Sequence, residues 1–182
     1  VPVSITAFTG ENLQERNIVD VAALSALAPN VNLDGGTPFS GSSAILSATI
    51  RGIGSDDFAF NIDPGVGIYL DGVFLARTVG ANQDLPDVER IEILKGPQGT
   101  LFGRNTIGGA ISIVTHNPGD EFRVSGDVST GSFNLLRARV TMDLPLTDGL
   151  GATVTAAVTN RTGFQRRIAY NGTPAEMRAI AN

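Results

Sequence analysis

The chain lacks several side chains on which enzyme and metal chemistry depends. It contains no cysteine, and His116 is its only histidine. Disulfides and thiolate metal sites are therefore excluded, and so is a histidine-rich metal site. A Ser-His-Asp arrangement would rest on His116 alone, and because this residue stands at a strand end beside Asn117-Pro118 we interpret it as a structural or surface residue. We therefore predict no catalytic residue, no metal ligand and no cofactor.

Positive charge and long hydrophobic runs are scarce as well. A net charge of −5 and a pI near 4.8 argue against a nucleic-acid partner. Lys95 is the only lysine beside twelve arginines. Arginine holds carboxylates in bidentate, partly buried pairs better than lysine does, although a GC-rich genome would produce the same bias. No window of about eighteen apolar residues exists, which excludes a transmembrane helix.

Glycine, by contrast, is abundant, at 22 of 182 residues against a usual fraction of roughly 7%. Five glycines lie between two strand-like apolar runs, 88–94 and 110–115; they are Gly96, Gly99, Gly103, Gly108 and Gly109. Glycine at this density favours backbone that takes a positive φ or approaches other backbone closely. We therefore expect a compact, loop-rich body here. The loop lacks the Lys-Ser/Thr pair of a phosphate-binding loop.

Hydrophobic periodicity and turn signals predict short elements before this stretch. Alternation over Val3–Phe8 indicates a strand, and Thr9 is placed to cap a short helix that follows. Asp20 is placed to cap a second helix, which should end at Pro29. The remaining expectations, in chain order, are a loop over 32–43, a strand over 44–53, a polar loop over 55–64 and a hairpin of 66–70 with 73–75 around Asp71-Gly72.

After residue 118 the sequence alternates between apolar and polar residues in three segments, over 122–129, 136–146 and 150–159. The second and third segments are about ten residues long, the length of a tilted strand that crosses a bilayer. One apolar and one polar face fit a membrane barrel with a polar lumen, but a soluble meander or sandwich gives the same alternation. Periodicity alone leaves both interpretations open.

The motifs resemble those of a known family. ERIEILKGP at 89–97, GTLFGRN at 99–105 and GGAISIVT at 108–115 occur in the order typical of the plug domain of TonB-dependent outer-membrane receptors. IRG at 50–52 and the Asp71-Gly72 hairpin are similar to family elements too. The resemblance implies an α+β plug domain over residues 1–118, with a small mixed sheet, short helices and Gly-rich loops. Residues 119–182 would be the first antiparallel strands of a transmembrane β-barrel, and the chain a fragment of a receptor of about 22 strands.

This resemblance implies a receptor of the bacterial outer membrane, in contact with its lipid, that captures a large, scarce nutrient. A ferric siderophore is the expected ligand, so iron would arrive as a transported chelate. The plug would close the lumen until TonB pulls on a segment that lies upstream of Val1. Two alternatives stay open: a receptor that senses its ligand and signals through an extra N-terminal domain, and a truncated module that does not transport.

The resemblance also implies roles for individual residues. Arg51 in IRG and Arg90 in ERIE match arginines expected to pair with carboxylates of the barrel wall and so latch the plug, and Glu89 and Glu92 would complete that polar network. Plug loops that face outside should contact the ligand, here over 37–43, 55–61 and 74–81. Aromatic rings and arginine suit flat, anionic iron chelates, and the candidates in these loops are Phe39, Asp56, Phe58, Phe60 and Arg77.

Overall fold

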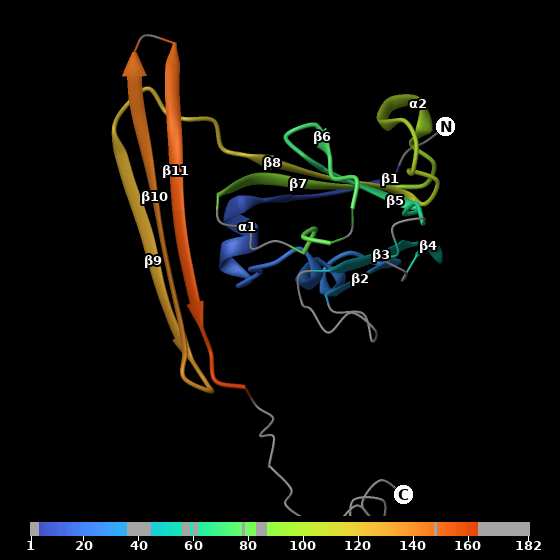
Figure 1. Ribbon diagram of the computed structural model, residues 1–182, viewed down its shortest axis with the longest axis horizontal. Coiled ribbons are helices and arrows are strands. Elements are labelled where there is room, and N and C mark those ends of the chain that lie inside the picture. Colours follow the sequence, from blue (N-terminus) through green and yellow to red (C-terminus); the bar gives the residue numbers. More distant parts are fainter. Residues whose placement is uncertain are drawn as a thin grey trace, which may run out of the picture.

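The structure is a computed structural model that describes residues 4–35, 45–55, 59, 62–77, 79–82, 87–147 and 149–163. Figure 1 shows an N-terminal body, described residues 4–115, and a C-terminal sheet of three long strands that stands beside it. The body contains β1 (Ser4–Thr9), α1 (Gly10–Glu15), the 3₁₀ helix η1 (Ala22–Ala26), β2 (Val31–Gly35), β3 (Leu46–Ile50), β4 (Ile53–Ser55), β5 (Val66–Leu70), β6 (Val73–Phe74), β7 (Val88–Lys95), α2 (Gly99–Phe102) and β8 (Gly109–Thr115). The C-terminal sheet contains β9 (Arg123–Gly131), β10 (Leu135–Thr147) and β11 (Leu150–Asn160). Within these ranges no helix is long and apolar enough to span a membrane.

A five-stranded mixed sheet forms the centre of the N-terminal body. Its strand order is β1-β7-β8-β5-β6; β5 and β8 are parallel, and the other neighbours are antiparallel. Because side chains alternate along a strand, Ile91 and Ile93 of β7 and Ile111 of β8 share one face, and all three are fully buried. They pack against η1, β2 and β3 in the main core. Each such burial contributes roughly 1.5–3 kcal/mol.

The other face of this sheet carries a smaller cluster that holds α2. Tyr69 is buried there with Leu94 and Ala110, and Phe74 and Phe102 pack against them. The Tyr69 ring lies 4.9 Å from the Phe102 ring, and its hydroxyl donates a 2.6 Å hydrogen bond to the Phe102 carbonyl. Burial raises the pKa of the Tyr69 phenol above its ordinary value of 10.0. This one side chain therefore ties the Gly-rich loop to the sheet.

The predicted helix caps are present. Thr9 accepts a hydrogen bond from the Asn12 backbone N–H at 3.3 Å at the start of α1. Asp20 accepts one from the Ala23 N–H at 2.8 Å, at the start of a segment that is 3₁₀ rather than α-helical. Both caps satisfy backbone donors that have no partner within the helix.

Three expectations about the elements were wrong in part. Residues 32–35, predicted as loop, belong to β2, because Val31 and Leu33 face the core and the segment pairs with β3. The strand predicted over 44–53 is interrupted by a two-residue turn at Arg51-Gly52, where both residues have positive φ (54° and 79°). Such a turn suits the twist of a tight hairpin. Finally, α2 lies in a segment expected to be loop throughout.

The C-terminal sheet is an antiparallel meander with one polar and one apolar face. Its strand order is β11-β10-β9, and β10 pairs with both neighbours. Large apolar side chains on one face are exposed, from Met142 at 37% to Val128 at 71%. Polar side chains of the other face, among them Ser129 and Thr159, line a cleft against the N-terminal body. The apolar face therefore points away from the body.

Two aspartates stabilise the end of β8, from which the chain continues to the C-terminal sheet. Asp71, in the hairpin turn, accepts hydrogen bonds from both the backbone N–H (2.8 Å) and the hydroxyl (2.9 Å) of Thr115. Asp87 lies 3.1 Å from Nδ1 of His116. Further on, the connector passes so close to β11 that a Cβ on Gly151 would lie 2.7 Å from Pro118. These contacts fix the direction in which the chain leaves β8.

Candidate functional site

Most of the predicted ligand contacts lie outside the described part of the chain. This is the case for Phe39, Asp56, Phe58 and Phe60. Arg77 is described; it is exposed and follows β6 in a stretch without regular structure. The ligand-contact assignment of all five residues therefore stays a prediction.

Arg51 sits at the tip of the β3–β4 hairpin, held by its backbone. Its N–H donates a 2.8 Å hydrogen bond to the Asn30 carbonyl, and its φ of 54° turns the chain. The side chain is exposed, and one guanidinium nitrogen comes within 3.5 Å of the position that a Cβ on Gly96 would occupy. Among the described residues no carboxylate is ion-paired with Arg51. Its charge is therefore available to a partner.

Lys95, next to Gly96, was not singled out from the sequence. It is 7% exposed, and its ammonium donates a 3.0 Å hydrogen bond to the Pro29 carbonyl. A lysine is almost never buried without partners. The signal that could have found it is its register: Lys95 lies at the i+2 and i+4 spacing of Ile93 and Ile91, the core-facing residues of β7.

Arg90 has carboxylate partners within its own strand. Its Nη1 lies 2.8 Å from Glu89 and its Nε 2.8 Å from Glu92. The hydrogen bond to Glu92 is the main cause that raises the pKa of the guanidinium; desolvation opposes it, and the charge of Glu92 and the contacts with Glu89 add to the rise. The three predicted residues thus form ion pairs with one another within β7. A pairing with the barrel wall stays a prediction.

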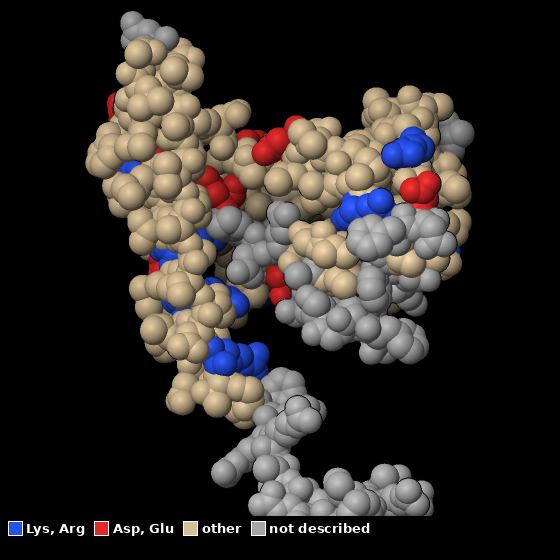
Figure 2. All heavy atoms as spheres, viewed as in Figure 1, with Lys and Arg blue, Asp and Glu red and all other residues tan. Residues whose placement is uncertain are grey.

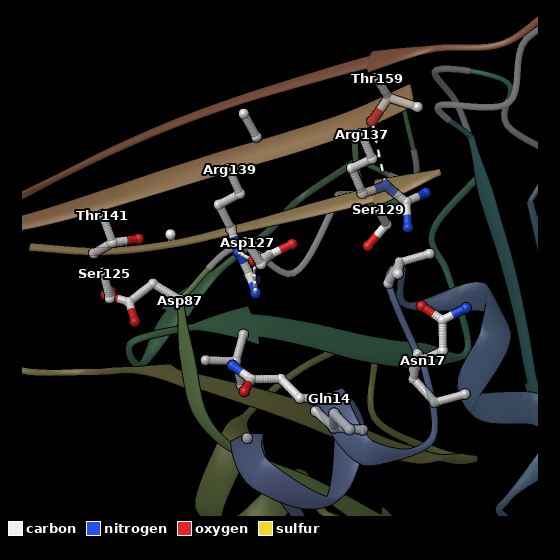
Figure 3. Close-up of a pocket in the computed structure, with 17 residues that line it drawn as sticks. Gln14, Asn17, Asp87, Ser125, Asp127, Ser129, Arg137, Arg139, Thr141 and Thr159 are labelled. Atoms are coloured by element: carbon white, nitrogen blue, oxygen red, sulfur yellow. Dashed lines mark hydrogen bonds and ion pairs between the residues drawn. The ribbon is translucent and has the colours of Figure 1, made fainter. Parts of the chain in front are cut away.

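A cleft of about 350 Å³ separates the N-terminal body from the polar face of the C-terminal sheet. Figure 3 shows Gln14 and Asn17 from the region of α1 on one side, and Ser129, Arg137 and Thr159 from the strands on the other. In Figure 2, basic side chains gather along the part of the C-terminal sheet that is turned to the body. The cleft is therefore lined mainly by groups that bind oxygen atoms or water.

Two described carboxylates of the C-terminal sheet, Asp127 and Asp143, accept hydrogen bonds from residues of the same sheet. Asp127 accepts a 2.6 Å hydrogen bond from Nε of Arg139. Asp143 accepts a 2.7 Å hydrogen bond from the Thr153 hydroxyl. The described part of the chain contains no group of three or more histidine, aspartate or glutamate side chains that would hold a metal ion.

Comparison with known proteins identifies the family. The family model described as TonB-dependent Receptor Plug Domain matches residues 1–110, and the chain belongs to this family. The pesticin receptor of Yersinia pestis is 33% identical over 150 residues, 81% of this chain and 21% of that receptor. The iron-regulated outer membrane virulence protein of Vibrio cholerae is 29% identical over 185 residues, 88% of this chain and 25% of that protein. The solved structure of the ferric yersiniabactin uptake receptor FyuA from Yersinia pestis matches with a TM-score of 0.68 and 29% identity, over 85% of this chain and 24% of that one.

The chain thus spans about a fifth to a quarter of the length of these relatives. The predicted family is confirmed, and so is the predicted fold class of a plug with a small mixed sheet and short helices, followed by antiparallel strands. Members of this family are receptors, and none of the comparisons points to an enzyme.

Proposed function

We propose that this chain is part of a TonB-dependent receptor of the bacterial outer membrane that takes up a ferric siderophore. The observation that carries the proposal is the arrangement of a plug-type sheet beside strands that turn a polar face towards it and an apolar face away. A polar inner face and an apolar outer face are what a barrel wall in lipid requires. Residues 1–118 would then be the plug and residues 119–182 the start of the wall.

The names of the relatives support the ligand class. One is an uptake receptor for ferric yersiniabactin, and another is an iron-regulated outer membrane protein. The ligand is therefore an iron chelate, and TonB is the partner that supplies energy by pulling on a segment before the plug. A receptor that senses its ligand and signals, and a plug-like module that does not transport, are the alternatives.

Arg51 is a better candidate than Arg90 for the plug side of the latch. Arg90 already has Glu89 and Glu92 as partners, whereas Arg51 extends from an exposed hairpin tip without a carboxylate partner among the described residues. Buried Lys95 lies next to Gly96, which the Arg51 guanidinium approaches, so two positive charges gather in this area. An acidic partner from the rest of the wall would stabilise both.

The test is iron uptake by the full-length receptor that contains this chain. It would be expressed in an iron-starved Gram-negative host that lacks its own siderophore receptors, and ⁵⁵Fe accumulation would be measured with purified ferric siderophores of different chemistry. We expect uptake of at least one chelate, and loss of that uptake when TonB is deleted. Chelate binding without TonB-dependent accumulation would instead favour a sensing receptor, and an absence of both would favour the non-transporting module.

The latch gives a prediction of its own. Replacing Arg51 by Gln should loosen the plug and raise the sensitivity of the host to a large antibiotic that is normally excluded from the outer membrane. The matched change Arg90→Gln removes a charge that is already paired within β7, so it should leave this sensitivity near that of the wild type. Equal effects of the two changes would count against the assignment of Arg51.

A further inference from the structure

The cleft between the N-terminal body and the C-terminal sheet contains one cation whose charge no described carboxylate neutralises. Four charged side chains line it: Asp87, Asp127, Arg137 and Arg139. Arg139 is paired with Asp127, and Asp87 lies 3.1 Å from Nδ1 of His116. Of these four residues, only Arg137 of β10 has no partner of opposite charge among the described residues. Within the described residues Arg137 makes one long hydrogen bond, 3.4 Å from its Nε to the Thr159 hydroxyl, and no ion pair.

The neighbours of Arg137 are suited to bind oxygen atoms. In Figure 3 its guanidinium extends from β10 into the cleft, beside Ser129 of β9 and opposite Gln14 and Asn17 of the body. A guanidinium carries five N–H donors in a fixed fork, which matches the two oxygens of a carboxylate. Hydroxyl and amide groups around it supply further donors. Such a set of side chains favours an anionic oxygen group over an apolar one.

The cleft also has a size that suits part of a ligand. Its volume of about 350 Å³ lies at the low end of the range of about 300–1,000 Å³ for ligand cavities. A large iron chelate would not fit as a whole, but one of its carboxylate arms would. Because the cleft lies between the body and the polar face of β9–β11, a ligand that travels along that face would pass Arg137.

We propose that this cleft is a transit subsite for carboxylate groups of an anionic iron chelate, with Arg137 as the binding residue and Ser129, Gln14 and Asn17 as accompanying donors. The inference rests on the proposed transport function and deepens it by naming the chemical class of the ligand. Chelates with free carboxylates should use the subsite, whereas neutral chelates should not.

The test is a binding titration with citrate as the probe, in the full-length receptor in detergent micelles. Ala157, which lines the cleft on β11 but is not one of the proposed donors, would be replaced by cysteine and labelled with an environment-sensitive dye. Because this chain has no cysteine, only cysteines elsewhere in the receptor need replacement. We expect a saturable change of fluorescence with citrate that weakens as salt is raised.

Substitutions then assign the binding to Arg137. The change Arg137→Gln should weaken citrate binding about tenfold or more, since it removes a hydrogen-bonded charge, and Arg137→Lys should weaken it less because the charge stays but the fork is lost. The control is Arg123→Gln, on β9 of the same sheet but outside the cleft, which should leave the affinity unchanged. A flat titration in the unsubstituted receptor, or equal affinities in Arg137→Gln and the control, would overturn the proposal.

Measurements of ⁵⁵Fe uptake separate this inference from the proposed function. If ferric chelates accumulate but citrate does not bind the cleft, the transport function stands and the subsite does not. If citrate binds through Arg137 but no chelate is transported, the cleft binds anions without serving transit, and the proposed function fails. When both hold, Arg137→Gln should slow the uptake of ferric citrate more than that of a neutral ferric trishydroxamate.

Discussion

At the scale of single residues, Tyr69 shows how much of a loop one side chain can organise. It is the buried centre of a cluster with Phe74 and Phe102, and its hydroxyl reaches the backbone of α2. A Cβ on Gly67 would lie 2.8 Å from the Tyr69 ring, so this glycine leaves the space in which the ring packs. The ring contributes packing, and the hydroxyl satisfies a carbonyl at the end of a short helix.

Replacing Tyr69 by Phe separates these two contributions. The ring contacts should persist, while the loss of the 2.6 Å hydrogen bond to Phe102 should cost about 1 kcal/mol of local stability. Hydrogen exchange of the full-length receptor should therefore become faster in α2 and stay unchanged in β2 and β3. Replacement by Ala, which removes the ring as well, should accelerate exchange much further, by a cost of about 3–5 kcal/mol. Equal effects of Phe and Ala would contradict this separation.

The pKa of Tyr69 makes the same loop sensitive to alkaline pH. Burial raises the pKa of its phenol in the folded state above 10.0, the value of an exposed tyrosine. The neutral phenol therefore stabilises the fold at neutral pH, and this contribution is lost as the pH rises from 10.0 through the folded-state pKa. Protection of α2 against exchange, compared at pH 9 and pH 11 after correction for intrinsic rates, should fall in the wild type and fall less in Tyr69→Phe.

At the scale of elements, the sequence was most informative where a strand or cap depends on its own residues. The runs of β7 and β8, the Asp71-Gly72 hairpin and the caps at Thr9 and Asp20 were predicted from spacing alone. β2 was missed because its strand state depends on pairing with β3, which lies beyond a Gly- and Ser-rich stretch. α2 was missed because a helix of four residues is too short to show helical periodicity, and its position depends on Tyr69.

The β3–β4 turn allows a matched test of glycine conformation. Gly52 has a φ of +79° and open space around its α-carbon, whereas Gly99 has equally open space without a positive φ. Replacing Gly52 by Ala should destabilise the hairpin by about 1–2 kcal/mol because a Cβ is disfavoured in the left-handed region. Replacing Gly99 by Ala should be neutral or stabilise α2 by up to about 1 kcal/mol. Local exchange rates in the full-length receptor would measure both, and slower exchange around Gly52→Ala would contradict the explanation.

At the scale of the whole molecule, the candidate site could be predicted less well than the fold. Arg51 and Arg90 were proposed from motifs and Arg77 from its loop, and their roles stay predictions; the cleft at Arg137 was not predicted. Its lining combines the region of α1, the start of β7 and three strands that follow α1 by more than 100 residues in the chain. Neither alternation nor motif spacing reports which strand face will meet which helix. For Lys95 the alternation of β7 did indicate a core-facing position, but its partner, the Pro29 carbonyl, could not be predicted because it lies 66 residues away in the chain.

A charged substitution should change the stability of the receptor by different amounts on the two faces of the C-terminal sheet. Val140 is exposed on the apolar face, and Ser125, which pairs with the adjacent Thr141, lies on the polar face at the same level. If the apolar face meets lipid, Val140→Lys should cost up to about 2–4 kcal/mol, whereas Ser125→Lys should cost little. Folding into bilayer vesicles, followed by unfolding in guanidinium chloride, would measure the difference. Similar costs at both positions would contradict a lipid-facing assignment.

The pairing of the first strand with the seventh has a consequence for the order in which the molecule is assembled. β1 pairs with β7, with Ser4 opposite Lys95, so β1 must wait for its partner until synthesis has passed β7. The strands β9, β10 and β11 join consecutive neighbours through short turns and need no such delay. Because closing distant contacts is slower than closing local hairpins, β1 is made before the rest of the sheet but is among the last of its strands to be paired. During that interval its six uncharged, strand-forming residues are open to wrong partners, which is when a holding chaperone would matter most.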